Sequence, residues 1–189
     1  RLIKNLSKRF DDKLTIINDD ILKYDLNLLN GRDLIIFGNL PYNISSQILV
    51  NLINYSYTKF SYKKLVLMFQ KEVADRILAQ DNSKDYGRLS IFSSWKLDIK
   101  KIMDINPSSF FPKPKVMSSL LVFEPKINYI KFKNSKNLEH ITNVFFNQRR
   151  KMIKKPLNIL FKNSKKVIDE LDLDINLRPQ NLKKDTFYK

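Results

Sequence analysis

The chain has 189 residues, of which 43% are hydrophobic and 12% aromatic, enough for one folded domain with a small appendage. Its 35 lysines and arginines outnumber 19 aspartates and glutamates, and the net charge of +16 favours a polyanionic partner, although a general lysine bias accounts for part of it. The absence of cysteine excludes disulfides and thiolate metal sites, and a single histidine argues against a histidine metal centre or a Ser-His-Asp triad.

Neither end of the chain carries a membrane or export signal. No apolar run reaches the length of a membrane span, and no signal peptide opens the chain, so we expect a cytoplasmic protein without a membrane partner. The chain opens on Arg1 instead of methionine and its pattern begins abruptly. We therefore expect that an N-terminal segment is missing.

The first half of the chain alternates between strand and helix patterns. Strands are predicted at residues 13–17, 35–39 and 64–70, and helices at residues 44–55 and 72–79. The short run at 34–37 is apolar on both faces, which is typical of a central parallel strand. This alternation predicts an α/β fold with a parallel, doubly wound sheet.

The second half changes from strands to helices. Residues 88–95 fit either a helix or a strand, 96–105 contain a strand, 106–115 form a proline-punctuated loop, and 119–123 form another strand. From about residue 135 onward the pattern predicts short helices only. We therefore expect an α/β domain over residues 1–126 and a small helical domain over residues 127–189.

The most informative motif is Asn39-Leu40-Pro41-Tyr42, directly after a predicted strand, where open α/β sheets bind their ligands. An adenine amino nitrogen is a poor nucleophile because its lone pair is delocalised into the ring. A methylating enzyme must therefore hold the two amino hydrogens with acceptors that favour a pyramidal nitrogen. Asn39 Oδ1 and the Leu40 carbonyl are candidates, with Pro41 keeping Leu40 extended and Tyr42 offering a stacking face. Alternatively, these are ordinary turn residues.

Asp20 closes the predicted strand at residues 13–17. Its carboxylate would lie in the same crevice as Asn39 and accept a hydrogen bond from the adenine amino group of a nucleoside cofactor. An aspartate in an Asp-Asp pair is also a common turn or capping residue. The residues alone leave both roles open.

Phe110 lies on the proline-punctuated loop. A phenylalanine held there can close the second face of a base stacked on Tyr42, forming an aromatic clamp for an extruded nucleotide. Phe111 is the rival candidate, and a buried loop anchor is the alternative role for Phe110. On the same loop, Lys113 and Lys115 are candidates for phosphate contacts.

A basic segment covers residues 145–155. As a helix it places Gln148, Lys151 and Lys155 on one face with Arg150 and Lys154 beside them, turns Met152 and Ile153 inward, and leaves Pro156 in the first turn of the next helix. Its cations predict contacts with RNA phosphates, and a solvated basic face is the alternative. The candidate RNA contacts here are Arg149, Arg150, Lys151, Lys154 and Lys155. Arg88 either contacts RNA or pairs with an acid.

Six motifs, in this order, resemble the ribosomal RNA adenine dimethyltransferase family of the small-subunit, kasugamycin-sensitivity type. They are Asp20 after Lys13-Leu14-Thr15-Ile16, Phe37-Gly38-Asn39-Leu40-Pro41-Tyr42-Asn43-Ile44-Ser45, Phe69-Gln70-Lys71-Glu72-Val73, Tyr86-Gly87-Arg88-Leu89-Ser90, Phe110-x-Pro112-x-Pro114-Lys115-Val116-x-Ser118 and Phe146-Asn147-Gln148-Arg149-Arg150-Lys151. The resemblance runs from Leu2 nearly to the C-terminus and is far more specific than any single motif.

The resemblance implies a Rossmann-like class I methyltransferase domain followed by a helical RNA-binding domain. It implies transfer of methyl groups from S-adenosylmethionine to N6 of two adjacent adenosines in a hairpin near the 3′ end of small-subunit rRNA. Asp20 and Asn39 would contact the cofactor region, and Tyr42 and Phe110 would sandwich the adenine. The implied partner is small-subunit rRNA in a 30S assembly intermediate, bound by a monomer without a metal.

One departure from the family concerns the cofactor. The family's glycine-rich loop and its ribose-binding acidic residue would lie upstream of Arg1, and the chain has only 3 glycines. We therefore expect the parent protein to be active and this chain to bind the cofactor weakly or not at all. The alternatives are a large-subunit methyltransferase of the macrolide-resistance type, a non-catalytic ribosome assembly factor and a DNA adenine methyltransferase.

Overall fold

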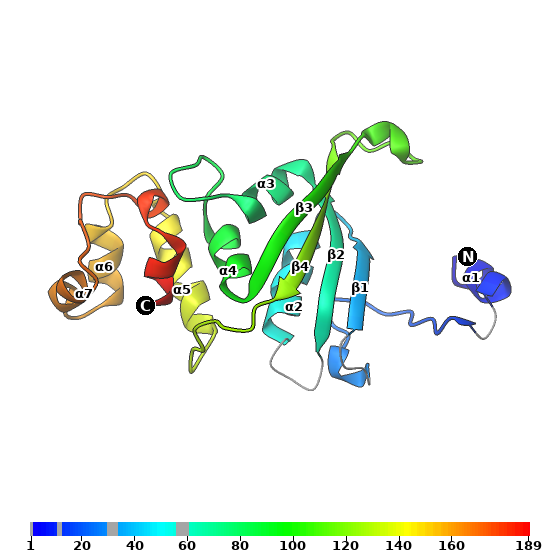
Figure 1. The fold of residues 1–189 in the computed structure, drawn as a ribbon, viewed down its shortest axis with the longest axis horizontal. Helices are drawn as coiled ribbons and strands as arrows, with labels where there is room; N and C mark the ends of the chain where they lie inside the picture. The colour runs from blue at the N-terminus through cyan, green and yellow to red at the C-terminus, as the bar shows by residue number, and fades with distance from the viewer. Residues whose placement is uncertain (1, 11–12, 30–33, 56–60) are drawn as a thin grey trace.

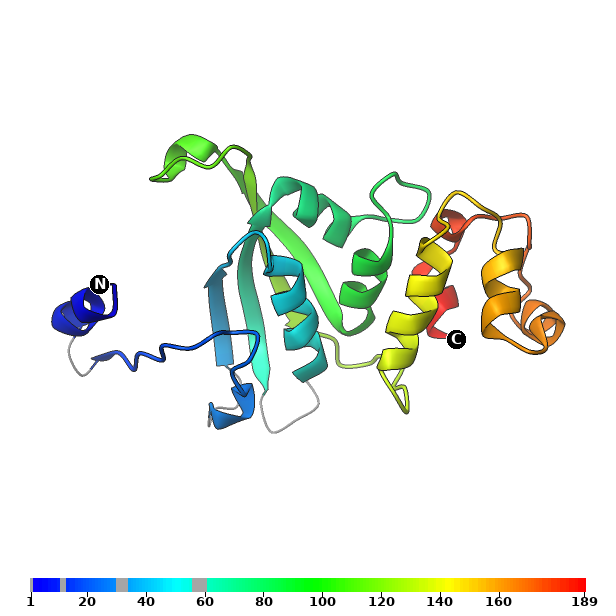
Figure 2. The same cartoon turned by 180° about the vertical axis from the view of Figure 1, so that it is seen from behind.

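The computed structural model describes residues 2–10, 13–29, 34–55 and 61–189. A sheet occupies the middle of the molecule, and the helices α2, α3 and α4 lie on the same face of it (Figures 1 and 2). Helix α1 (Leu2–Phe10) lies apart beyond β1, at the opposite end from the C-terminal helices. A short 3-10 turn, η2 (Leu26–Leu28), precedes the sheet.

The sheet has the strand order β1-β2-β4-β3. Strand β1 (Leu34–Asn39) runs parallel to β2 (Tyr62–Gln70), whereas β4 (Ser118–Pro125) is antiparallel to β2 and to β3 (Leu97–Ile105). The α/β prediction is confirmed, but the prediction of a parallel sheet is wrong for two of these three pairings. A helical crossover joins β1 to β2, while the connection from β3 to β4 contains only one 3-10 turn and so returns antiparallel.

The predicted strand at residues 13–17 is wrong. These residues form no strand, and the side chains of Leu14 and Ile17 are 44% and 48% exposed. Within the described part of the chain, β1 pairs only with β2, so this segment has no neighbour to complete its backbone hydrogen bonds. A period-two pattern cannot make a strand without such a neighbour.

Helices α2 (Ser45–Tyr55) and α3 (Lys71–Leu78) confirm the two predicted helices to within one residue. The ambiguous stretch at residues 88–95 is helical, as α4 (Arg88–Lys96). It contacts α2, α3, β3 and α5, and even Ser90 and Ser93 are buried in it. A helix buried on nearly all sides has little amphipathic periodicity, which explains the ambiguity of its sequence.

The C-terminal region is helical, as predicted. It contains α5 (Lys136–Phe146), α6 (Lys154–Leu160), α7 (Ser164–Glu170) and the 3-10 turns η4 (Pro179–Asn181) and η5 (Lys184–Tyr188). It is joined to α4 by apolar and polar contacts: Trp95 packs against Tyr129 and Phe132, and the Tyr188 hydroxyl donates to the Ile91 carbonyl at 2.6 Å. The hydrophobic core is therefore continuous between the sheet and these helices.

The basic segment is not the continuous helix that the sequence predicts. Helix α5 ends at Phe146 and α6 begins at Lys154, with turns between them. In one continuous helix the ring of Pro156 would clash with the Met152 carbonyl, four residues earlier. Met152 is 56% exposed instead of turned inward, whereas Ile153 is buried as expected. Pro156 lies in the first turn of α6, as predicted.

Candidate functional site

The carboxyl ends of β1, β2 and β3 meet at one edge of the sheet. Asn39 is in register with Met68 of β2, and Ser118, the first residue of β4, is in register with Gln70 and Ile105. The turn after β1 and the loop from β3 to β4 therefore begin at the same edge. In Figure 1 this loop projects past the ends of β3 and β4.

Gly38 leaves room for the side chain of Leu40. A Cβ atom at Gly38 would lie 2.7 Å from Leu40 Cδ2 and 2.8 Å from Leu67 Cδ2, so the ends of these leucine side chains would have to shift. Leu40 can therefore fold back against the core, while Asn39 on the opposite side of the strand is exposed. The side chain of Leu40 is an anchor, and its functional group is the backbone carbonyl.

Two hydrogen-bond acceptors are free at this edge. Among the residues that the structure describes, the Asn39 side chain and the Leu40 carbonyl have no hydrogen-bond partner. They belong to consecutive residues, just before the turn in which the Ile44 amide donates to the Pro41 carbonyl at 3.2 Å. The two acceptors that the sequence assigns to an amino group are thus both unpaired within the described part of the chain, and their binding of one amino group stays a prediction.

Tyr42 is held at both of its ends. Ser45 Oγ donates to the Tyr42 carbonyl at 3.1 Å, and the Tyr42 hydroxyl lies 2.6 Å from Ser118 Oγ. The ring itself is only partly buried. A ring that is fixed at its hydroxyl and still accessible is suited to stacking with a base.

The two loop phenylalanines differ in exposure. Phe110 follows the 3-10 turn η3 (Pro107–Ser109) and is partly buried, and its amide donates to the Pro107 carbonyl at 3.2 Å. Phe111 is fully exposed. The far end of the loop is attached to α3, since the Lys71 amide donates to the Met117 carbonyl at 2.9 Å. Which ring closes over the base stays a prediction.

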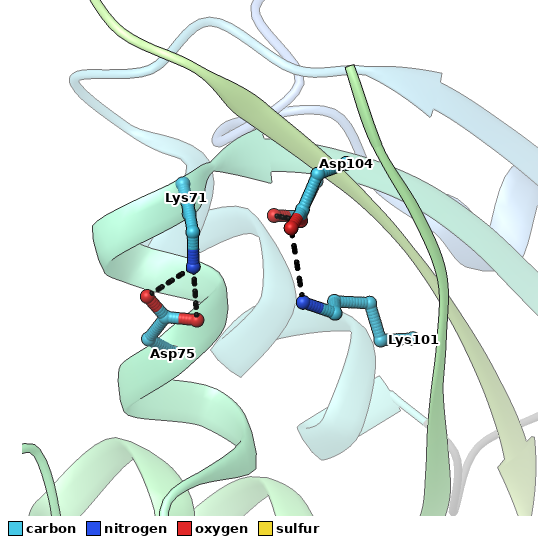
Figure 3. A network of polar contacts seen from close by, with 5 residues as sticks. Lys71, Asp75, Lys101 and Asp104 are labelled. Atoms are coloured by element: carbon cyan, nitrogen blue, oxygen red, sulfur yellow. Dashed lines mark hydrogen bonds and ion pairs between the residues drawn. The ribbon is translucent and has the colours of Figure 1, made fainter. Parts of the chain in front are cut away.

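A polar network that the motifs did not predict lies beside this edge (Figure 3). Lys71 pairs with Asp75 at 2.8 Å, and Asp104 pairs with Lys101 at 3.1 Å and accepts from Ser119 Oγ at 2.6 Å. The bonds from Ser119 and Lys101 hold the pKa of Asp104 below its usual value, and the bond to Asp75 raises the pKa of Lys71. Asp104 is therefore held as an ionised partner of Lys101, and Asp75 forms an ion pair with Lys71. The only sequence signal for these ion pairs is their spacing, which is four residues for Lys71 and Asp75 and three residues for Lys101 and Asp104.

Asp20 forms a turn. Its carbonyl accepts from the amides of Lys23 and Tyr24, both at 2.8 Å, and its Oδ1 accepts from the Leu22 amide at 3.0 Å. The side chain is exposed, and one carboxylate oxygen is left for another donor. The turn alternative is thus observed, and the contact with a cofactor stays a prediction.

The candidate RNA contacts fall into two groups. Seven are exposed: Arg88, Lys113, Lys115, Arg150, Lys151, Lys154 and Lys155. Arg149 is different, because its guanidinium donates to the Ser83 carbonyl at 3.0 Å and to Gln180 Oε1 at 3.3 Å. Arg149 therefore connects the junction between α5 and α6 to two distant turns.

An open cavity of about 630 Å³ lies beside four of these cations. Its lining consists of Arg150, Lys151, Met152, Lys154, Lys155, Asn158, Ile159 and Arg178. The lining contains no acidic side chain, so the cavity is suited to a polyanion. Arg178 is the residue that the sequence missed here, because only the fold brings it next to the basic segment.

The described residues contain no group of three histidine, cysteine, aspartate or glutamate side chains that could hold a metal ion. In the same ranges, no helix is long and apolar enough to cross a membrane.

Comparison with known proteins gives consistent matches. The family model described as ribosomal RNA adenine dimethylase matches residues 1–189. The chain is 55% identical over 184 residues to a ribosomal RNA small subunit methyltransferase A from Pelagibacter ubique (strain HTCC1062), covering 97% of this chain and 70% of that protein. A protein of the same name from Ehrlichia ruminantium (strain Gardel) is 40% identical over 181 residues, covering 93% of this chain and 66% of the relative. The chain thus spans about two thirds of the length of these relatives.

Solved structures match the fold. A dimethyladenosine transferase from Plasmodium falciparum superposes with a TM-score of 0.78 at 26% identity, covering 98% of this chain and 74% of that one. The 23S rRNA methyltransferase ErmE superposes with a TM-score of 0.66 at 16% identity, covering 98% and 75%, a likeness of fold alone. These neighbours confirm the Rossmann-like methyltransferase architecture that the motifs predict.

Proposed function

The chain belongs to the ribosomal RNA adenine dimethylase family, and from this membership we propose that the whole protein dimethylates N6 of two adjacent adenosines in small-subunit rRNA. The observation that carries the proposal is the pair of free acceptors, Asn39 Oδ1 and the Leu40 carbonyl, at the carboxyl end of β1. Enzymes of this family and fold take the methyl group from S-adenosylmethionine.

The acceptors act on the nucleophile. By holding both amino hydrogens, Asn39 and the Leu40 carbonyl favour a pyramidal nitrogen whose lone pair points away from the ring and toward the methyl donor. Acceptors fixed before the reaction stabilise the positive charge that develops on that nitrogen. The proton leaves a nitrogen that has become cationic, so no strong base is needed. Asp75 and Asp104, the carboxylates of the neighbouring network, are already paired with lysines.

Tyr42 and Phe110 are the proposed clamp for the target base. Tyr42 offers a partly exposed ring fixed at its hydroxyl, and Phe110 follows η3 on the loop that begins at the same sheet edge. An adenosine must leave its base stack to reach such a site, and stacking between two rings offsets part of that cost. Pro41 shapes the turn between the acceptors and the clamp.

The described residues fit only part of S-adenosylmethionine. Asp20 retains one carboxylate oxygen for an adenine amino group, and the side chain of Asn39 is exposed. The described glycines do not provide the turn that would let the backbone approach the methionine end of the cofactor. The space at Gly38 is filled by Leu40 and Leu67, and Gly87 faces the ring of Phe146. We therefore propose that the part of the chain that the structure describes holds the cofactor only weakly by itself.

Exposed cations on two parts of the molecule supply the RNA contacts. Lys113 and Lys115 lie on the loop of Phe110, and the cavity lined by Arg150, Lys151 and Arg178 lies on the C-terminal helices. Contacts with phosphates position an RNA without reading its sequence. The proposed partner is small-subunit rRNA within a 30S assembly intermediate, bound in the cytoplasm by a monomer, with residues 1–126 carrying the chemistry and residues 127–189 the additional RNA contacts.

The test is transfer of radiolabelled methyl groups from S-adenosylmethionine by the whole protein. The substrates are unmethylated small ribosomal subunits, large subunits and adenine-rich DNA. Label confined to the small-subunit RNA, approaching two methyl groups on each of two adenosines, is the expected result. Label in large subunits or in DNA would assign the protein to a different substrate, and no label in any of the three would favour a non-catalytic assembly factor.

A further inference from the structure

The function proposed above uses a Tyr42 ring that is fixed at its hydroxyl, but it assigns no role to the residue that fixes it. The Tyr42 hydroxyl lies 2.6 Å from Ser118 Oγ, across 76 residues of chain. Ser118 is fully buried and begins β4, immediately after the loop that carries Phe110. Tyr42, on the turn after β1, is one ring of the proposed clamp, and Phe110, on the loop before β4, is the other. The bond between Tyr42 and Ser118 thus joins that turn to the start of β4.

We propose that Ser118 is a positioning residue, which fixes the Tyr42 ring at the angle at which the target adenine stacks on it. The inference rests on the proposed methyltransferase function. The final torsion of a tyrosine has broad minima, so a partly exposed ring is not oriented by its backbone alone. A hydrogen bond at the hydroxyl acts at the far end of the side chain, where it restricts ring rotation most.

Ser118 is itself held firmly enough for this task. It is in register with Gln70 on one side and Ile105 on the other. The preceding residue, Met117, accepts from the Lys71 amide at 2.9 Å. A polar group on a strand that pairs with a neighbour on each side holds its partner more precisely than one on a loop.

The neighbouring serine provides a matched control. Ser119 is buried to the same extent as Ser118, and its hydroxyl also makes one bond of 2.6 Å to a distant residue. Successive side chains of a strand point to opposite faces, so Ser119 bonds to Asp104 and not to Tyr42. Replacing either serine by alanine removes one buried hydroxyl, but only Ser118→Ala releases the ring.

The experiment compares four variants of the whole protein on unmethylated small subunits: Ser118→Ala, Tyr42→Phe, the double variant and Ser119→Ala. We expect Ser118→Ala and Tyr42→Phe each to lower kcat by roughly five- to tenfold, the loss of about one hydrogen bond, with little change in KM for the RNA. The double variant should be no slower than either single variant, because both remove the same bond. Ser119→Ala should keep kcat while its melting temperature falls as much as that of Ser118→Ala.

Two results would overturn the role of Ser118 in an active enzyme: a Ser118→Ala protein as fast as Ser119→Ala, or losses that multiply in the double variant. If Ser118→Ala does not fold, Tyr42→Phe removes the same bond from the exposed side and carries the comparison with Ser119→Ala by itself. A whole protein that methylates none of the substrates would instead overturn the proposed function, and this role with it.

Discussion

The carboxyl edge of the sheet and the junction between α5 and α6 are both rich in polar side chains, but they are built differently. At the edge, Leu40 is anchored in the core and Tyr42 is bonded to Ser118, so the backbone on the C-terminal side of Asn39 is held in place. At the junction, Arg150 and Lys151 are exposed. The chemical step depends on acceptors placed to within a fraction of an ångström, whereas contact with phosphates tolerates mobile cations.

The largest expected effect comes from replacing Asn39, the side-chain acceptor at the end of β1. Asn39→Ala should slow methylation of small subunits by roughly 10²-fold or more, because a preorganised acceptor acts mainly on the transition state. Binding of the RNA should stay nearly unchanged. Single-turnover methylation and filter binding with the same RNA separate the two effects. Unchanged turnover would remove Asn39 from the mechanism.

Charge reversal at the junction between α5 and α6 should weaken RNA binding and leave the chemical step nearly unchanged. Arg150→Glu with Lys151→Glu should weaken RNA binding at least tenfold and flatten its salt dependence, by about 0.7 to 0.9 in the log–log slope for each phosphate that the protein no longer neutralises. The bound complex should still methylate at a rate close to the unmodified one. Affinity measured across a series of salt concentrations checks this, and an unaltered slope would return the junction to a solvated basic face.

Two neighbouring arginines of the basic segment should differ in their effect on stability, because Arg149 is bonded to distant turns and Arg150 is exposed. Arg149→Ala removes the donors to Ser83 and Gln180 and should cost about 1–3 kcal/mol of unfolding free energy. Arg150→Ala, its exposed neighbour, should change that free energy by less than about 0.5 kcal/mol. Urea unfolding of the two variants makes the comparison. Equal stabilities would mean that the bonds of Arg149 contribute nothing to the fold.

A buried lysine away from both regions should affect stability alone. Lys96 is 2% exposed, its ammonium donates to the Ile53 carbonyl at 2.9 Å, and burial lowers its pKa to about 7. Between that pKa and the ordinary value of 10.5, the unfolded chain binds one proton more than the folded chain, so unfolding free energy rises with pH in this window. Lys96→Met should remove this rise, as urea unfolding at several pH values between about 7 and 10 will show.

The matched control for this prediction is Lys113→Met, which replaces an exposed lysine of the loop. It should leave the pH dependence of unfolding unchanged. If both variants keep the rise, the ammonium of Lys96 is not the group responsible for it.

The motif after β1 was predictable because its signal is local. An apolar run followed by Asn-Leu-Pro-Tyr specifies a strand and then a turn, and both are found. Helix α4 was ambiguous because it is buried on several sides, and residues 13–17 failed as a strand because they have no pairing neighbour among the described residues. Both failures concern contacts with distant segments.

The sequence by itself determined the family, the helices and strands from β1 to α3, and the residue types of the acceptors and cations. Those properties depend on short-range patterns and on motifs read along the chain. Only the tertiary structure decided that β4 returns antiparallel, that Arg149 bonds to Ser83 and Gln180, and that Ser118 reaches Tyr42. Each of these depends on bringing together residues far apart in the chain, which packing of the core and completion of backbone hydrogen bonds determine, and local residue preference does not.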